Sequence, residues 1–133
     1  MDTYVLDTFA LMAYFQDEPS SDTIETLLTQ ALDAQVAVCV SLISVGELYY
    51  MIYRKRGAAR ADEIWSDLQQ FPVAVYPVGE ARVLAAARLK ATHRVSYADA
   101  FSIALAQELD GTVITGDPEF KDVESLVPVM WLT

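Results

Sequence analysis

Two side chains that build many catalytic sites are almost missing from this chain. Cysteine and histidine each occur once among 133 residues, as Cys39 and His93. One histidine cannot form a His-rich zinc site, and one cysteine leaves no intramolecular disulfide, which fits a reducing compartment. Cys39 lies in the apolar run 36–40, so we interpret it as a buried strand residue and not as a catalytic thiol.

Other absences narrow the class of protein further. There is no Walker A loop, GxGxxG fingerprint, GxSxG elbow or HExxH motif, so the usual apparatus of several enzyme classes is missing. The apolar stretches are too short or too interrupted to span a membrane, and the N-terminus lacks the basic region and apolar run of a signal peptide. There is no internal repeat or linker. We therefore expect one domain over residues 1–133, located in the cytoplasm with no membrane contact.

Positive charge is also scarce. Nine Lys and Arg against nineteen Asp and Glu give a formal net charge of −10, which weakens binding to free polyanions. Eight of the nine basic residues lie between positions 54 and 94, in and just after the middle third of the chain, where they form either a positive flank beside an acidic cleft or ordinary solvated helix faces. A divalent cation or a basic protein partner would compensate for the acidic surplus. The eight are Arg54, Lys55, Arg56, Arg60, Arg82, Arg88, Lys90 and Arg94, and the ninth is Lys121.

What the chain does have is a regular alternation of apolar runs and helical segments, with 53% hydrophobic residues. This alternation predicts a single-domain three-layer α/β/α fold around a mostly parallel five-stranded sheet. Strands are expected at 3–6, 36–40, 73–76, 112–115 and, at the edge, 127–131. Helices are expected at 8–15, 22–33, 44–56, 58–70, 80–92 and 97–109.

Residues with capping preferences mark several of these helix ends. Asp22, with Glu25 three residues later, resembles a capping box. Ser44 and Ser96 are expected to cap the helices that follow them. Gly57 is expected to end the third helix.

Four acidic residues fall where an expected strand ends or a helix begins. Asp7 follows the first strand directly, Asp117 follows the fourth, and Glu47 lies in the first turn of the helix after the second. Ligands of open α/β sheets bind beyond the carboxyl ends of the strands, so these side chains are expected to converge there. Asp99 begins a helix that leads into a strand, and such a helix is expected to start at the opposite edge. Asp99 reaches the carboxyl edge of the sheet if the loop 93–96 crosses back over the sheet, or if the helix is long and tilted.

Clustered carboxylates cannot all stay ionised without a counterion, because like charges at close range raise one another's pKa values. Oxygen ligands suit Mg²⁺ or Mn²⁺, and such ions can supply a nucleophile for phosphodiester hydrolysis. Each acid also has an ordinary interpretation as a turn former, a cap or a partner of the helix dipole. The coincidence of four favours a metal site. Among the remaining acids, which we assign mainly to solvated surface, Glu119 is the strongest further candidate.

Four segments of the chain carry a family resemblance: YVLDTFALMAYF, SLISVGELYY, VSYADAFSIALA and TVITGDPEF. In this order and spacing they resemble the PIN domain and, within it, the VapC toxins of bacterial toxin–antitoxin pairs. The resemblance covers essentially the whole chain. It implies an endoribonuclease that depends on one or two Mg²⁺ or Mn²⁺ ions and is built on a parallel five-stranded sheet. The acidic quartet of that family maps onto Asp7, Glu47, Asp99 and Asp117, which brings Asp99 into the site.

The resemblance extends to two hydroxyl side chains and fails at one neighbouring position. Thr8 matches the usual Thr or Ser after the first Asp. Thr115 matches the hydroxyl of the T-x-D element, which would orient a metal water or the neighbouring acid; it is alternatively an ordinary strand-end Thr. Phe9 departs from the family, in which many members carry a small polar residue there. We therefore expect substrate access near Asp7 to differ.

VapC-like proteins usually form homodimers and are inhibited by a small antitoxin whose basic or aromatic tail enters the acidic cleft. The resemblance therefore implies a homodimer and a VapB-like antitoxin partner. His93 and Arg94 are expected either to contact RNA or to form a plain solvated loop. The third helix is apolar on more than one face, which suits a core side and a second contact surface, unless all of it packs inside one domain. Its apolar residues are Leu48, Tyr49, Met51, Ile52 and Tyr53.

We therefore predict a metal-dependent endoribonuclease that leaves a 5′-phosphate. Asp7, Asp99 and Asp117 are expected to hold the metal, and Glu47 to complete the set directly or through water. Three alternatives remain: a PIN-fold nuclease that processes RNA without being a toxin, a metal-free interaction domain, and a receiver-like phosphoacceptor. The last needs a Lys after its final strand, and this chain ends in MWLT.

Overall fold

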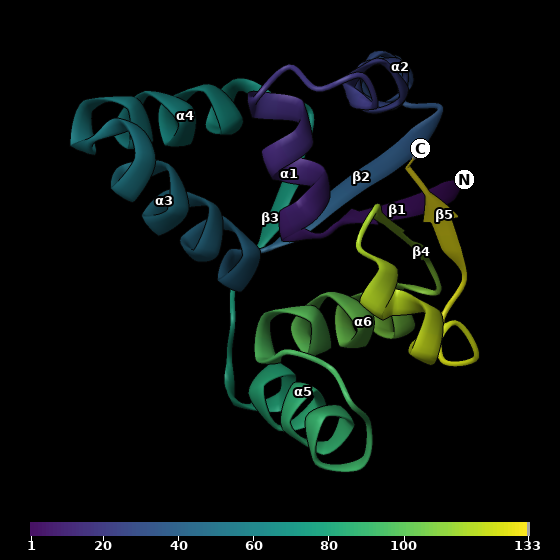
Figure 1. The fold of residues 1–133 in the computed structure, drawn as a ribbon. Coiled ribbons are helices and arrows are strands. Elements are labelled where there is room, and N and C mark those ends of the chain that lie inside the picture. Colours follow the sequence, from purple (N-terminus) through teal and green to yellow (C-terminus); the bar gives the residue numbers. More distant parts are fainter. Residues whose placement is uncertain (133) are drawn as a thin grey trace.

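The computed structural model describes residues 1–132, which form a five-stranded sheet between two layers of helices (Figure 1). The strand order is β3-β2-β1-β4-β5, and every neighbouring pair is parallel. The predicted α/β fold is therefore confirmed, with a sheet that is parallel throughout. The strands are β1 (Asp2–Leu6), β2 (Val36–Ser41), β3 (Ala74–Tyr76), β4 (Thr112–Thr115) and β5 (Val129–Trp131).

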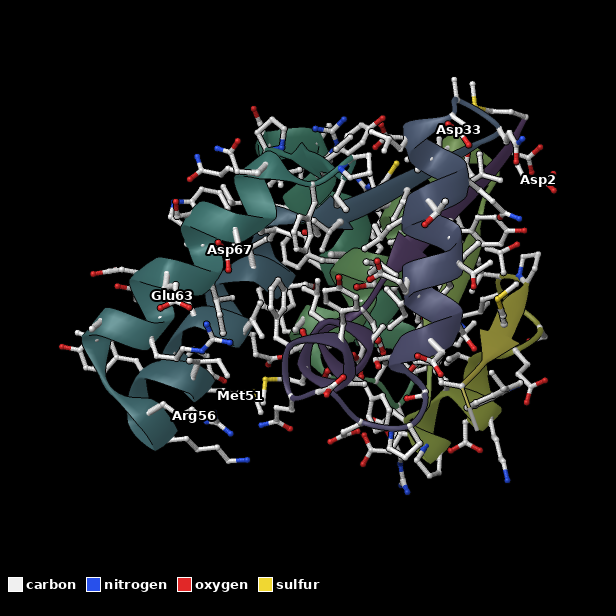
Figure 2. The ribbon with its side chains drawn as sticks, turned by 90° about the horizontal axis from the view of Figure 1, so that it is seen from above. Asp2, Asp33, Met51, Arg56, Glu63 and Asp67 are labelled. Atoms are coloured by element: carbon white, nitrogen blue, oxygen red, sulfur yellow. The ribbon has the colours of Figure 1, made fainter. Side chains whose placement is uncertain are left out.

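The helices divide between the two faces of the sheet (Figure 1). One face carries α1 (Thr8–Phe15), α2 (Ser21–Leu32), α3 (Leu42–Arg56) and α4 (Ala58–Gln70). The other carries α5 (Glu80–Thr92), α6 (Tyr97–Leu109) and the 3₁₀ helix η1 (Pro118–Val123). The helices α3 and α4 form a hairpin that extends beyond the sheet, and Figure 2 shows it from above. Within residues 1–132, no helix has both the length and the apolar character that a membrane span requires.

The sheet is buried on both faces, which explains why its strands read as short continuous apolar runs. Successive side chains of β1 point to opposite faces. Leu6 packs with the residues of α1 to α4, whereas Val5 packs with Ile103 of α6 and Phe120 of η1. Cys39 of β2 belongs to this second core and is 2% exposed, as predicted for a structural cysteine.

The N-terminus of α3 lies one turn earlier than predicted. Ser41, the last residue of β2, caps the helix because its Oγ accepts a hydrogen bond from the backbone N–H of Ile43 at 3.2 Å. Ser44 is instead fully buried within α3, where its hydroxyl lies 3.2 Å from that of Ser102 in α6. The prediction that Ser44 caps α3 was wrong, because this serine satisfies its hydroxyl across the core.

The capping box predicted at the start of α2 is also absent. The helix begins at Ser21, and Ser20 precedes it without making a side-chain capping bond. Glu25 instead accepts a hydrogen bond from the hydroxyl of Tyr14 in α1, at 2.6 Å. Glu25, which the local sequence pattern assigned to a helix cap, therefore makes a tertiary contact with α1 instead.

Two other predicted helix ends are confirmed. The hydroxyl of Ser96 accepts a hydrogen bond from the backbone N–H of Asp99 at 3.1 Å and so caps α6. Gly57 ends α3 with φ +91°, a conformation that favours glycine, and α4 begins at the next residue.

The direction of α6 corrects the expectation for Asp99. Gly111, just after the C-terminus of α6, packs against Thr3 near the start of β1, whereas Asp99 lies in the same cleft as Asp7, just after the end of β1. The helix therefore runs antiparallel to the strands. A helix that returns the chain to the beginning of a parallel strand must start at the carboxyl edge, so the expectation that Asp99 starts at the opposite edge was wrong.

Candidate metal centre

The four predicted acids line one cleft at the carboxyl edge of the sheet, with a volume of about 460 Å³. Asp7 joins β1 to α1 and caps that helix, because its Oδ1 accepts a hydrogen bond from the backbone N–H of Ala10 at 2.8 Å. Asp117 follows β4 and caps η1. Asp99 projects from the first turn of α6, and Glu47 from the second turn of α3. Four elements that are distant in sequence therefore contribute one carboxylate each.

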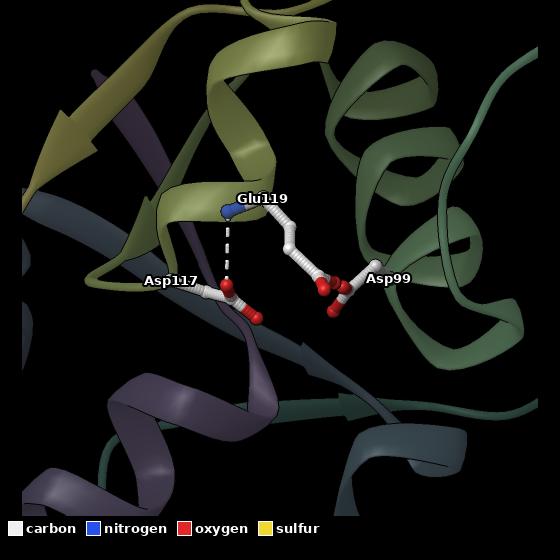
Figure 3. Close-up of side chains that lie close together, drawn as sticks. All are labelled: Asp99, Asp117 and Glu119. Atoms are coloured by element: carbon white, nitrogen blue, oxygen red, sulfur yellow. Dashed lines mark hydrogen bonds between the residues drawn. The ribbon is translucent and has the colours of Figure 1, made fainter.

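A fifth carboxylate, that of Glu119, joins this group. Asp99, Asp117 and Glu119 each offer an oxygen, and the three oxygens lie within 4.8 Å of one another (Figure 3). The backbone N–H of Glu119 donates to Oδ1 of Asp117 at 3.0 Å, so the turn that caps η1 also brings the two side chains together. Glu119 was not in the predicted quartet. Its signal in the sequence was its place two residues after Asp117.

Burial strongly affects the ionisation of two of these acids. Desolvation is the largest influence on Asp7, which is 1% exposed, and raises its pKa to about 7. Hydrogen bonds from the Thr115 side chain and the backbone N–H of Ala10 oppose this rise, and the charges of Asp99 and Asp117 add to it. Asp7 is therefore only partly ionised at neutral pH in the absence of a cation.

The same physical effects act on Asp99. Desolvation raises its pKa to about 6, against a lowering by the hydrogen bond with Ser96. The carboxylates of Asp117, Glu47 and Glu119 raise it further. Positive charge in this cleft would relieve both the burial cost and the mutual repulsion.

Thr115 connects two of the acids. Its Oγ1 accepts a hydrogen bond from the backbone N–H of Asp117 at 3.0 Å, while its side chain also bonds to Asp7. Thr115 is fully buried at the end of β4. The hydroxyl therefore links the carboxyl group of Asp7 to the backbone of Asp117, across the neighbouring strands β1 and β4.

Thr8 has a different environment from Thr115. It lines the cleft and is 6% exposed, and its Oγ1 is buried without a hydrogen-bond partner. A buried polar atom of this kind usually has a partner. The donors that converge here are carboxylate and hydroxyl oxygens, which are the ligands that Mg²⁺ and Mn²⁺ prefer. The residues present therefore fit such a cation.

The rest of the lining is mixed in character. Phe9, Met12 and Met51 are apolar, and Lys55 is basic. Lys55 comes from the middle third of the chain, in which a positive flank was one of two alternatives. Other basic residues of that third are engaged elsewhere: Arg60 pairs with Glu63, and Arg82 pairs with Glu108 at 3.0 Å. His93 contacts its own helix, with Nδ1 3.0 Å from the Thr92 hydroxyl.

Comparison with known proteins identifies the family. Residues 4–126 match the PIN domain, so the chain belongs to the PIN domain family. A sequence search of the curated proteins found no significant match.

Solved structures with this fold include chains from VapBC toxin–antitoxin systems. A chain of VapBC2 from Rickettsia felis, crystallised with a DNA fragment of its promoter, has a TM-score of 0.77 and 15% identity, with 98% of this chain and 99% of that chain covered. DNA-bound VapBC from Salmonella typhimurium gives a TM-score of 0.75 and 16% identity, with both chains fully covered. VapC20 from Mycobacterium tuberculosis, a toxin that cleaves the sarcin–ricin loop, gives 0.72 and 18%, with 90% and 94% covered. At these identities the likeness concerns the fold.

Proposed function

We propose that this protein is a metal-dependent endoribonuclease of the VapC type, acting in the cytoplasm. The observation that carries the proposal is the convergence of five carboxylates in one cleft of a PIN domain. Two of these carboxylates have raised pKa values that a cation would lower again. The fold that the chain shares with VapC20, an RNA-cleaving toxin, supports the choice of RNA as substrate.

Each side chain has a role that follows from its position. A bound Mg²⁺ or Mn²⁺, as one ion or two, would supply Lewis acidity and an activated water to the phosphodiester. Asp7, Asp99 and Asp117 would hold it, with Glu47 and Glu119 completing the set directly or through water. Thr115 links the carboxyl group of Asp7 to the backbone of Asp117, and Thr8 would offer its unpartnered hydroxyl to the cation or its waters. Hydrolysis with the 3′-oxygen leaving gives a 5′-phosphate product.

We also propose that the protein is inhibited by a VapB-like antitoxin and forms a homodimer. The VapBC structures that share its fold support the antitoxin. A surface for protein contacts is available on α3, where Leu48 and Ile52 are buried but Tyr50 and Tyr53 are 46% and 50% exposed. An acidic cleft also suits a basic antitoxin segment.

The test is cleavage of a panel of structured RNAs by the purified protein with Mn²⁺ or with EDTA. Asp7→Asn removes a cleft acid, and Asp67→Asn, an exposed acid on α4 (Figure 2), is the matched control. The proposal predicts cleavage that needs Mn²⁺, survives Asp67→Asn and is lost in Asp7→Asn. If wild type neither cleaves any RNA nor binds Mn²⁺, the nuclease proposal is wrong.

The toxin role requires a separate measurement in cells. Induction of the wild-type chain in a bacterial host is expected to stop growth, and induction of Asp7→Asn is not. Metal-dependent cleavage in vitro without growth arrest would instead favour a nuclease that processes RNA.

A further inference from the structure

One apolar residue of the cleft is held in an unusual way. Phe9 is the second residue of α1, two positions after Asp7, and its side chain lines the cleft with 40% of the residue exposed. A large apolar ring at the edge of a carboxylate cluster contributes little to core packing. Its position therefore calls for another explanation.

The ring is seated against the backbone of Gly116. A Cβ atom built on Gly116 would lie 2.3 Å from Cε1, 2.7 Å from Cζ and 3.0 Å from Cδ1 of Phe9. These three atoms form one edge of the ring, so any larger residue at position 116 would displace it. Gly116 lies between Thr115 and Asp117. The Phe9 ring therefore contacts the same loop that carries Asp117, one of the proposed metal ligands.

We propose that Phe9 is a stacking platform for one unpaired nucleobase next to the scissile phosphate. This inference rests on the proposed function. The carboxylates and their cation would hold the phosphate, and a base attached to the same nucleotide or its neighbour would reach a ring only two residues from Asp7. Inside an RNA helix, bases are stacked on one another, so only an unstacked base can lie on a protein ring.

The chemistry of the ring selects an aromatic partner. An aromatic face stacks on any nucleobase, and each stacked base typically strengthens binding roughly 5- to 150-fold. The cleft volume of about 460 Å³ is within the usual range for small-molecule sites, roughly 300–1,000 Å³. The contact with Gly116 fixes the ring before the RNA arrives, so less freedom is lost on binding.

The test measures binding apart from cleavage. Single-stranded RNA hexamers carrying 2-aminopurine at each position in turn are titrated into the Asp7→Asn protein. The same titration is repeated with Phe9→Leu, Phe9→Trp or Tyr97→Leu added to that protein. Leu keeps an apolar side chain but removes the aromatic face, and Trp keeps an aromatic face. Tyr97, which is 44% exposed on α6 and does not line the cleft, is the matched control.

We expect fluorescence quenching at one position of the hexamer, at least roughly fivefold weaker binding with Phe9→Leu, and unchanged binding with Tyr97→Leu. Phe9→Trp is expected to restore both affinity and quenching. Equal affinity of Phe9→Leu and its parent, or quenching spread over all positions, would overturn the proposal. So would the absence of hexamer binding to a protein that cleaves RNA.

A second comparison tests the contact between the Phe9 ring and Gly116. Gly116→Ala is expected to weaken hexamer binding as Phe9→Leu does, and to add no further loss in the Phe9→Leu protein, because a leucine leaves room for the methyl group. If the losses of affinity from Gly116→Ala and Phe9→Leu were additive, Gly116 would not act through Phe9, and this part of the proposal would be contradicted. In the cleaving protein, Phe9→Leu is expected to raise KM by a similar factor while kcat changes less. If no RNA is cleaved but hexamers still stack on Phe9, the proposed nuclease function is wrong, and the proposal that Phe9 stacks on a base still holds.

Discussion

Asp7→Asn is expected to make the metal-free protein more stable while removing its activity. The physical reason is the cost of burying an ionised carboxylate. Because the pKa of Asp7 is about 7 in the folded state and 3.8 in the reference state, the folded protein binds more protons between about pH 4 and pH 7. The stability of wild type therefore falls as the pH rises through this window, and the loss is complete above about pH 7.

The magnitude follows from the same values. A shift from 3.8 to about 7 is roughly three pKa units, and at about 1.4 kcal/mol for each unit the cost is about 4 kcal/mol at pH 8. Asparagine removes the charge but still buries an amide, and it keeps the capping contact with the N–H of Ala10. We therefore expect a net gain of about 2–4 kcal/mol, which corresponds to a rise in Tm of roughly 6–12 °C.

The assay is thermal and urea unfolding in EDTA, at pH 5 and pH 8, of wild type, Asp7→Asn and the surface control Asp67→Asn. The advantage of Asp7→Asn over wild type is expected to grow from pH 5 to pH 8, and Asp67→Asn is expected to follow wild type at both. Added Mn²⁺ should stabilise wild type and Asp67→Asn more than it stabilises Asp7→Asn, which keeps four of the five cleft carboxylates. If Asp7→Asn were less stable than wild type at pH 8 in EDTA, the burial argument would be refuted.

Three further substitutions test other contacts. Thr8→Val removes the unpartnered hydroxyl and is expected to raise the free energy of unfolding of the metal-free protein by about 1 kcal/mol, as measured in urea. Thr8→Ser, which keeps the oxygen, is the control. A Thr8→Val protein less stable than wild type would mean that the hydroxyl has a partner. Gly111→Ala would place a Cβ 2.8 Å from the carbonyl oxygen of Thr3 and is expected to lower the free energy of unfolding by about 1–3 kcal/mol. Gly46→Ala, whose Cβ would have nothing within 4 Å, is the control and is expected to cause no loss of stability. Equal unfolding midpoints for the two variants would contradict this prediction. Glu119→Gln is expected to weaken Mn²⁺ binding roughly tenfold in calorimetry, and Glu124→Gln, an exposed neighbour, to leave it unchanged. Identical affinities would exclude Glu119 from the site.

The parallel sheet and three of the cleft acids were predictable for a common reason. Parallel strands buried on both faces read as short apolar runs, and residues that follow such strands gather at one edge. Asp7 and Asp117 were therefore placed at this edge because each comes just after a predicted strand. Glu47 was placed in the right cleft even though the predicted cap at Ser44 was wrong, because helix α3 begins at the same edge in either register.

The remaining features depend on contacts that local patterns do not encode. Ser44 finds Ser102 in another helix, and Glu25 finds Tyr14, so both leave the capping roles that their spacing favoured. The position of Asp99 required the direction of α6 relative to the strands. The contact between Phe9 and Gly116 joins residues more than a hundred positions apart. The sequence shows an aromatic residue and a glycine there, but only the fold brings them together.

The most direct test of the central claim is the chemistry of the RNA ends. Wild type and Asp117→Asn are incubated with RNA in Mn²⁺ or EDTA, and the new ends are identified by phosphatase and ligation assays. Hydrolysis at the carboxylate cleft predicts 5′-phosphate and 3′-hydroxyl ends that form only with Mn²⁺ and only in wild type. Ends carrying a 2′,3′-cyclic phosphate, formed equally in EDTA and by Asp117→Asn, would show that any cleavage arises elsewhere and would contradict the assignment of this cleft.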